Sequence, residues 1–185
     1  LAKRKGVPLH VVQWPHGDLI DRIWQRYEKD PTRPPWPSSA IRYCTSDLKR
    51  APISKFIRNH YPSDKVVISA MGLRAEESPA RAKRETFRVR KDSTSPTKNR
   101  FVYDWLPIQD WTTEQVWDEI NCHDGNCHPA YKLETPNERL SCALCVLASY
   151  GDLMNGATHN PDVYREYCKI EAVTGYSFRQ NLWVS

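Results

Sequence analysis

One continuous apolar run constrains the fold of this chain more than any other feature. It extends from Val66 to Met71, follows Lys65 and ends at Gly72. A short apolar run of this kind is typical of a parallel strand that is buried on both faces. Parallel strands need long crossovers, and segments with helical periodicity flank the run. We therefore predict an α/β fold with a mostly parallel sheet flanked by helices.

Other segments carry weaker but readable signals. Two helices and one strand are predicted from periodicity, over residues 18–27, 161–173 and 7–14 respectively. A third helix is predicted over residues 112–120, because Thr112 and Gln115 have the spacing of a capping box. Residues 1–6 have the pattern of a helix end. The proline-rich stretch 30–39 is predicted to be a mobile or ligand-covering loop, and the charged stretch 88–100 a flexible excursion.

The length and composition favour one globular, soluble domain over residues 1–185. Apolar residues make up 39% of the chain and charged residues 26%, which is enough for a core. The net charge of +5 is compatible with an anionic ligand or with nucleic acid. No apolar run reaches the ~20 residues of a membrane span, and no signal peptide is visible, so we expect a cytoplasmic protein. Because Leu1 opens the sequence in place of Met, we expect that the chain is truncated at its N-terminus.

Six cysteines suggest metal, cluster or redox chemistry rather than a disulfide scaffold, although disulfides are the alternative. Cys142 and Cys145 have CxxC spacing, so their sulfurs can converge on one iron, one zinc or one disulfide. Cys44 is predicted to precede a helix capped by Thr45 or Ser46 and broken or kinked at Pro52. The positive end of a helix dipole there would favour a thiolate.

A further ligand is needed if these three thiols hold a cluster. Cys168 is the first candidate for a fourth ligand and Cys127 the next, while a buried cysteine acting as a small apolar residue is the alternative. A zinc site made by Cys122 and Cys127 with the CxxC pair is also open. These alternatives predict different metals in the purified protein.

The polar loop after the apolar run is the candidate anion site. It runs from Gly72 to Arg81 and carries Arg74 and two glutamates that could orient the guanidiniums. In an open parallel sheet, ligands bind beyond the carboxyl ends of the strands, which is where this loop begins. Gly72 is expected to permit a sharp exit from the strand. The alternative is a solvated loop whose charges pair with one another.

Taken together, these motifs resemble those of the phosphoadenosine phosphosulfate reductase family, within the PP-loop adenine-nucleotide alpha-hydrolase superfamily. The resemblance covers most of the chain and rests on four segments: Arg42-Tyr43-Cys44 with Lys49 and Pro52; Gly72-x-Arg74 with Glu77-Ser78 and Arg81; Trp105-x-Pro107-Ile108-x-Asp110-Trp111-Thr112 with Val116-Trp117; and Cys142-x-x-Cys145. It implies an adenine-nucleotide alpha-hydrolase-like fold. It also implies that Arg74 and Arg81 are catalytic and that Lys49, Gly72, Arg74, Ser78 and Arg81 bind the nucleotide or its anionic group.

The chain departs from this family pattern at three places. Tyr43 stands where cluster-bearing members have a second cysteine, so the implied metal ligands are Cys44, Cys142, Cys145 and Cys168. The Ser-Gly-Gly-x-Asp-Ser loop of the superfamily is absent and is expected before Leu1. The C-terminal Glu-Cys-Gly-Leu-His tail of the reductases is also absent from the final residues. An Arg-x-Ser-Cys-x-x-Cys segment followed by Glu171 and Gly175 is similar to an uncharacterised phage and bacterial branch, related to proteins that put sulfur into DNA backbones.

The resemblance implies an enzyme of sulfur metabolism that acts on an adenine nucleotide. The reaction would be reduction of a sulfonucleotide or adenylation-driven sulfur transfer, with ATP or a sulfonucleotide as substrate and a 4Fe-4S cluster as cofactor. The implied partners are an electron or sulfur donor protein and, as a sulfur acceptor, DNA or tRNA. The alternative is a non-catalytic, zinc-stabilised module that binds nucleic acid or a partner protein.

Overall fold

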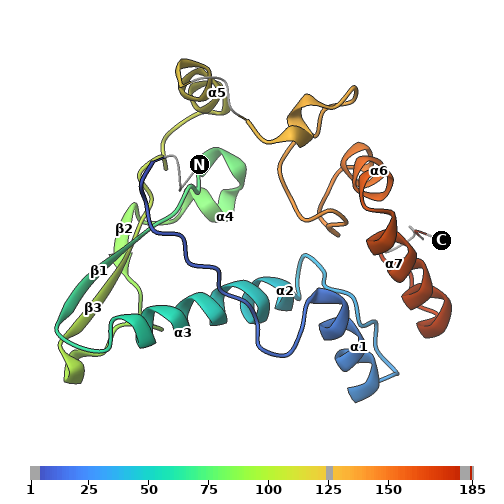
Figure 1. Cartoon of the computed structure of the whole chain (residues 1–185), viewed down its shortest axis with the longest axis horizontal. Helices are drawn as coiled ribbons and strands as arrows, with labels where there is room; N and C mark the ends of the chain where they lie inside the picture. Colours follow the sequence, from blue (N-terminus) through green and yellow to red (C-terminus); the bar gives the residue numbers. More distant parts are fainter. Residues whose placement is uncertain (1–4, 124–126, 180–183, 185) are drawn as a thin grey trace. The chain divides into compact units, whose positions relative to one another are not determined.

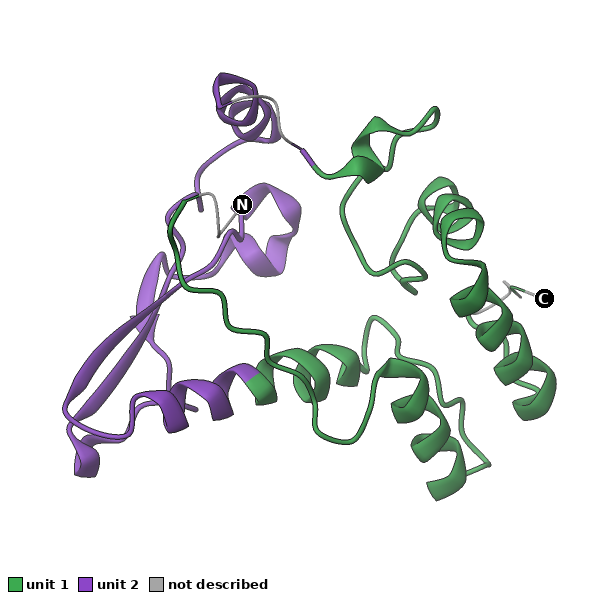
Figure 2. Cartoon of the chain, in the orientation of Figure 1, with its two compact units in different colours: residues 1–52, 128–185 green, residues 53–127 purple. Residues whose placement is uncertain are grey.

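The structure is a computed structural model that describes residues 5–123, 127–179 and 184 (Figure 1). The chain divides into two compact units (Figure 2). The first combines residues 1–52 with 128–185, and the second contains residues 53–127. The α/β class is confirmed, because helices and one sheet are both present. The prediction of a single domain over the whole chain stays a prediction.

Helix α1 (Leu19–Lys29) in the first unit confirms the helix predicted over residues 18–27. Asp18 is its N-cap, and one carboxylate oxygen accepts hydrogen bonds from the backbone N–H groups of Ile20 (2.7 Å) and Asp21 (3.2 Å). The Asp21 carboxylate accepts from the N–H of Asp18 in return, which completes a capping box. The buried Ile23 faces the core of this unit.

The helical stretch that carries Cys44 begins earlier and is more continuous than predicted. It consists of α2 (Tyr43–Thr45), a π-helical turn η1 (Ser46–Arg50) and α3 (Ala51–His60). Arg42 holds the N-cap position without a capping side-chain bond, so the predicted cap at Thr45 or Ser46 is wrong. The helical stretch does not break at Pro52, and the irregularity beside it is the π-helical turn that ends at Arg50. The wider π turn directly before α3 relaxes the backbone where the proline N–H is missing.

Two further helices and an aromatic cluster form the core of the first unit. Helix α6 (Tyr150–His159) was not predicted, whereas α7 (Pro161–Thr174) confirms the final predicted helix. The ring of Trp36 packs against those of Tyr167 and Phe178, at centroid distances of 5.1 and 5.4 Å. Trp36 also donates a hydrogen bond from its indole N–H to the carbonyl of Tyr176 (2.8 Å). The loop over residues 30–39 is therefore anchored in the core, contrary to the mobile segment that its prolines suggested.

The second unit contains a three-stranded sheet in the order β1-β3-β2 (Figure 1). Strand β1 (Lys65–Ala70) pairs in parallel with β3 (Arg100–Trp105), and β2 (Phe87–Val89) pairs antiparallel with β3. The described sheet is thus mixed rather than mostly parallel. The antiparallel pair arises because the chain turns back between residues 90 and 99 without a crossover helix.

The exposure of β1 corrects the prediction that it is buried on both faces. Val66 and Ile68 share one face of the strand and are 70% and 56% exposed, so this face is open to solvent. Strand β1 is also an edge strand of the described sheet. The central strand is β3, which the sequence analysis did not predict. Its inward residues include two charged side chains, Arg100 and Asp104, so it lacks the apolar signature of a central strand.

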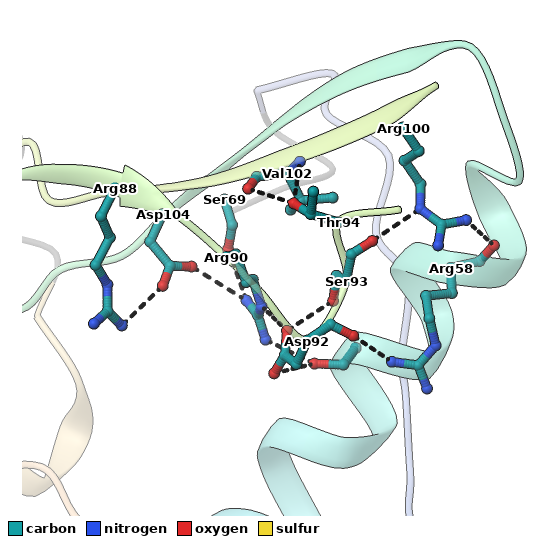
Figure 3. Close-up of polar contacts among 11 residues, drawn as sticks. Arg58, Ser69, Arg88, Arg90, Asp92, Ser93, Thr94, Arg100, Val102 and Asp104 are labelled. Atoms are coloured by element: carbon teal, nitrogen blue, oxygen red, sulfur yellow. Dashed lines mark hydrogen bonds and ion pairs between the residues drawn. The ribbon is translucent and has the colours of Figure 1, made fainter. Parts of the chain in front are cut away.

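Residues 88–100 form an ordered polar network, not the flexible excursion predicted (Figure 3). Arg90 donates hydrogen bonds to Ser69 on β1 (3.2 Å) and to Ser54 on α3 (3.0 Å), and pairs with Asp92 (3.0 Å). Asp104 lies between Arg88 (3.0 Å) and Arg90 (3.5 Å). The network thus ties the loop to both the sheet and α3.

The remaining helical elements are short, apart from α5. They are η2 (Ala75–Glu77), α4 (Pro79–Ala82), η3 (Pro96–Lys98), α5 (Thr113–Cys122) and η4 (Pro129–Lys132). Helix α5 confirms the helix predicted over 112–120, and its capping box is formed by Thr112 and Gln115. Residues 7–14 form no strand, so that prediction is wrong. The predicted helix end at residues 1–6 lies mostly outside the described residues.

No helix in the described ranges combines the length and the apolar character that crossing a membrane requires.

Candidate functional site

The loop from Gly72 to Arg81 follows the carboxyl end of β1, as predicted. Its first residue does not adopt the left-handed backbone conformation, and an added Cβ would lie 3.7 Å from Ile108 Cδ1, an ordinary contact. The geometry of the strand exit therefore does not require glycine at position 72. A glycine there leaves the backbone uncovered by a side chain, which suits close approach of a ligand.

Arg74 is held in place by the start of helix α5. One guanidinium nitrogen lies 2.7 Å from the Glu76 carboxylate, and the other donates to the hydroxyl of Thr113 (3.1 Å). The same Glu76 carboxylate accepts from the backbone N–H of Thr113 (2.7 Å). That hydrogen bond is the main cause of a lowered pKa for Glu76, and the Thr113 hydroxyl and Arg74 lower it further. Arg74 is thus a fixed cation, only 14% exposed, with a charged partner.

Arg81 and Ser78 are placed by the short helix α4. The Ser78 hydroxyl caps this helix by accepting from the backbone N–H of Arg81 (3.3 Å), and the Arg81 guanidinium pairs with Glu77 one turn away. Glu77 also accepts from the backbone N–H of Arg74 (3.0 Å). The two arginines predicted to hold an anion therefore engage the glutamates of their own loop. This matches the alternative in which the charges of the loop pair with one another. Arg74 and Arg81 are therefore ordered, and each has its charge partly neutralised by a glutamate.

Gln109 is a residue of this loop region that the sequence analysis missed. Its buried side-chain amide donates to the backbone carbonyls of Arg81 (2.9 Å) and Arg84 (3.3 Å). The backbone carbonyl of Gln109 accepts from the backbone N–H of Ala75 (2.8 Å). Gln109 therefore fixes both ends of the arginine loop. Its position within the Pro-Ile-x-Asp-Trp segment is the signal that could have identified it.

The cysteines of the candidate cluster site belong to the first unit. Burial is the main cause of a raised pKa for the Tyr167 hydroxyl, and the charges of Cys142, Cys145 and Cys44 raise it further. Lys49 Nζ lies 3.6 Å from the sulfur of Cys142, which brings a predicted anion-binding cation to the thiols. The helical stretch that carries Cys44 and the loop of the CxxC pair therefore meet at Lys49 and Cys142.

Cys168 has different surroundings. Its thiol donates to the backbone carbonyl of Val184 (3.6 Å) and hydrogen-bonds the hydroxyl of Tyr164, whose pKa it raises. Tyr164 and Cys168 are four residues apart and share one face of α7. The structure therefore pairs Cys168 with Tyr164 and Val184.

The chemistry of the cysteines suits a metal, but their described geometry does not form a metal site. All six cysteines are free thiols, and thiolates are the ligands that iron–sulfur clusters and zinc prefer. Within residues 5–123, 127–179 and 184, no three His, Cys, Asp or Glu side chains are grouped closely enough to hold a metal ion. The set of thiols suits a soft metal, but the described arrangement is not a closed coordination site.

The contact of α6 with the cysteine loop is unusually close. Gly156 faces the backbone between Cys142 and Cys145, and an added Cβ would collide with the carbonyl oxygen of Ala143. Helix α6 can therefore approach this loop only because residue 156 has no side chain. Gly156 is a second residue that the sequence analysis missed.

Tyr43, which replaces the second cysteine of the family pattern, is a core residue. It is 6% exposed and donates a hydrogen bond to the carbonyl of Pro35 (2.6 Å). Burial raises the pKa of its hydroxyl, so the side chain stays neutral. The position next to Cys44 therefore contributes packing instead of a ligand.

Comparison with known proteins gives one family match. The model of the phosphoadenosine phosphosulfate reductase domain matches residues 21–173, which include the arginine loop and Cys44, Cys142 and Cys145. An uncharacterized protein of Methanocaldococcus jannaschii is 25% identical over 154 residues, which cover 80% of this chain and 30% of the relative. An uncharacterized 37.8 kDa protein of Escherichia phage 186 is 29% identical over 119 residues, which cover 64% of this chain and 34% of the relative.

The chain spans about a third of the length of these curated relatives. No solved structure matches the chain.

Proposed function

This chain belongs to the phosphoadenosine phosphosulfate reductase domain family, and from that premise we propose that it is an enzyme that acts on an adenine nucleotide in sulfur metabolism. The observation that carries the proposal is the extent of the family match, which includes both the arginine loop and the cysteine motifs. The reaction is reduction of a sulfonucleotide or adenylation-driven sulfur transfer. The complete fold is an adenine-nucleotide alpha-hydrolase-like sheet, and the protein works in the cytoplasm.

The anionic group of the nucleotide is bound by the arginine loop. Arg74 and Arg81 are the catalytic cations, and Gly72, Ser78 and Lys49 complete the anion site. The ordered guanidiniums support this role, because fixed donors stabilise developing negative charge without having to reorganise. Each arginine keeps N–H groups beyond those that contact its glutamate partner.

The cluster proposal rests on the thiols whose charges act on Tyr167. Cys44, Cys142 and Cys145 are proposed as ligands of a 4Fe-4S cluster, with Cys168 as a fourth ligand that must move toward them. When bound, such a cluster would supply one-electron chemistry or an open iron for sulfur. Lys49 beside Cys142 adds positive charge that favours thiolates and attracts an anionic substrate. A donor protein delivers electrons or sulfur, and DNA or tRNA accepts sulfur in the transfer reaction.

The test of this proposal is nucleotide turnover by the complete natural protein, purified without oxygen. Pyrophosphate release from ATP would mark adenylation, and sulfite release from a sulfonucleotide would mark reduction. We expect Arg74→Gln to lower the rate by about 100-fold, because one charge-stabilising donor is lost. Arg84→Gln is the matched control, since it removes an exposed charge three residues beyond Arg81 and should retain activity.

Two results would refute the proposed activity. One is a cluster-loaded protein that releases neither product. The other is an Arg74→Gln variant that turns over as fast as the parent. Zinc in place of iron would instead support a zinc-stabilised binding module.

A further inference from the structure

A cationic cleft lies on the first unit, built from helix α1 and the loop that follows it. Its volume is about 260 Å³, and it is lined by Arg22, Arg26, Lys29, Asp30, Arg33 and Pro34. None of these residues belongs to the arginine loop or to the cysteine motifs. Four cations and one carboxylate therefore line a cleft that the proposed function does not use.

Three of these cations lie on one side of α1. Arg22, Arg26 and Lys29 are separated by four and three residues, which is the spacing of side chains on one helix face, and Arg33 follows in the loop after the helix. Like charges at this spacing destabilise an isolated helix. The arrangement therefore costs folding energy unless an anion compensates it.

Arg26 is the central cation of the cleft and has an unsatisfied donor. Its Nε atom is buried and has no hydrogen-bond partner. The central carbon of its guanidinium lies 4.4 Å from the ring centre of Tyr43, and this cation–π contact orients the guanidinium. A buried N–H without a partner is expensive, and a bound anion would satisfy it.

Arg22 is fixed by a different partner. Its Nε and one terminal nitrogen donate to the same Asp47 oxygen, at 3.0 and 2.8 Å, which leaves the third nitrogen outside this pair. Burial tends to raise the pKa of Asp47, but hydrogen bonds from Ser46 and Arg22 more than offset it and lower the pKa. Asp47 is therefore ionised at neutral pH, and Arg22 is oriented before any ligand arrives.

Lys29 and Arg33 form the outer part of the cleft. No ion pair joins Lys29 to any described residue. Arg33 pairs with Asp30 at 3.2 Å, but its side chain is 82% exposed, so this pair is weak. Even with Asp30 and Asp47 counted, positive charge is in excess at the cleft.

We propose that this cleft binds a phosphate group. Planar guanidinium forks match the oxygens of phosphate, and two of them are held here by an aromatic ring and a carboxylate. The volume is smaller than the roughly 300 Å³ at which whole-ligand pockets begin, so it suits a phosphate or diphosphate rather than an entire nucleotide. The site is independent of the proposed function, because it shares no residue with Arg74, Arg81 or the cysteines.

The test is titration calorimetry of the whole chain with inorganic pyrophosphate. We expect binding to the parent, and binding at least about tenfold weaker to Arg26→Gln, because charge-assisted hydrogen bonds are lost. Lys29→Gln should also bind pyrophosphate more weakly. Because the Lys29 side chain is exposed, this variant should fold, and it keeps the test valid if Arg26→Gln unfolds. Lys132→Gln removes an equal charge from an exposed position of the same unit and should bind like the parent.

The source of the phosphate is distinguished by a second probe, a labelled twelve-nucleotide single-stranded DNA. DNA binding that Lys29→Gln weakens and pyrophosphate displaces would support a nucleic-acid phosphate. Pyrophosphate binding without DNA binding would support a small phosphorylated ligand. The proposal is overturned if millimolar pyrophosphate does not bind the parent, or if Lys29→Gln and Lys132→Gln bind it equally. Neither result depends on nucleotide turnover.

Discussion

Glu171 shows how one buried charge holds the end of this chain. Its carboxylate has no exposed surface and accepts hydrogen bonds from the backbone N–H groups of Phe178 (2.6 Å) and Val184 (2.9 Å). A charged acceptor for two N–H donors is favourable in a dry core, where each donor would otherwise be unsatisfied. Glu171 therefore fastens the segment after α7 to the aromatic cluster.

Replacing this carboxylate by an amide should destabilise the protein. We expect Glu171→Gln to lower the free energy of unfolding by about 1–3 kcal/mol, because the charge-assisted bonds are lost and an N–H₂ group is brought near N–H donors. Urea unfolding measures this change. Glu166→Gln, on an exposed position of the same helix, is the control and should change the free energy little. Equal effects of the two variants would show that Glu171 contributes no special anchoring.

Gln109 acts on the arginine loop in a comparable way. We expect Gln109→Leu to accelerate hydrogen exchange at the backbone amides of Ala82 and Arg84, because the two carbonyls that Gln109 binds would lose a donor. Exchange measured by mass spectrometry on peptides from this loop tests it. Peptides from α7 provide the internal control. Unchanged exchange in the loop would mean that α4 is ordered without Gln109.

At the scale of elements, α6 and the cysteine loop depend on one missing side chain. Gly156→Ala should lower the free energy of unfolding by about 1–3 kcal/mol, because the new methyl group forces the backbone at Ala143 to move. Gly151→Ala is the matched control in the same helix, since its Cβ would meet no atom within 4 Å. That change should stabilise α6 by up to about 1 kcal/mol. A stabilised Gly156→Ala variant would contradict the close contact.

The polar network of the second unit should make stability depend on pH. Burial tends to raise the pKa of Asp92, but hydrogen bonds from Ser93 and Arg90 outweigh it, so the folded pKa lies below the ordinary value of 3.8. A lowered folded pKa gives stability that is fully present above the unfolded pKa and is lost as the pH falls through the folded value. Asp92→Asn should therefore be less stable than the parent at pH 7.

The free energies of unfolding of the parent and of Asp92→Asn should become equal in acid. Urea unfolding at intervals between pH 7 and pH 3 should show the gap between parent and Asp92→Asn constant down to about pH 5, then narrowing as Asp92 becomes protonated. A gap that does not change with pH would mean that charge on Asp92 plays no part in the network.

Elements with local signals were predictable from the sequence, and elements set by tertiary contacts were not. The capping residues Asp18 and Thr112 identify α1 and α5 directly. Strand β3 escaped prediction because it places Arg100 and Asp104 in the interior. Arg100 donates to backbone carbonyls of Ser93 in the loop and Arg58 in α3, and Asp104 pairs with Arg88. The apolar pattern of β1 does not reveal that it is an edge strand, because the order of strands in a sheet is set by tertiary pairing and not by the local sequence.

At the scale of the whole molecule, the family match extends across both compact units. Residues 21–173 include the arginine loop of the second unit and the cysteines of the first. The site residues could be proposed from their motifs, but their partners could not. Short-range pairing of Arg74 with Glu76 and of Arg81 with Glu77 depends on how η2 and α4 turn. The spacing of the cations on α1 can be read from the sequence. Only the fold shows that Tyr43 contacts Arg26 and that Asp47 binds Arg22.

The central claim is that Cys44, Cys142 and Cys145 hold an iron–sulfur cluster. The most direct measurement is the metal and acid-labile sulfide content of protein purified without oxygen, for the parent and for Cys142→Ala. Cys122→Ala, on an exposed cysteine of α5, is the matched control. The account predicts about four irons and four sulfides per chain, lost in Cys142→Ala and kept in Cys122→Ala. Zinc in the parent, or a parent free of metal and sulfide, would contradict it.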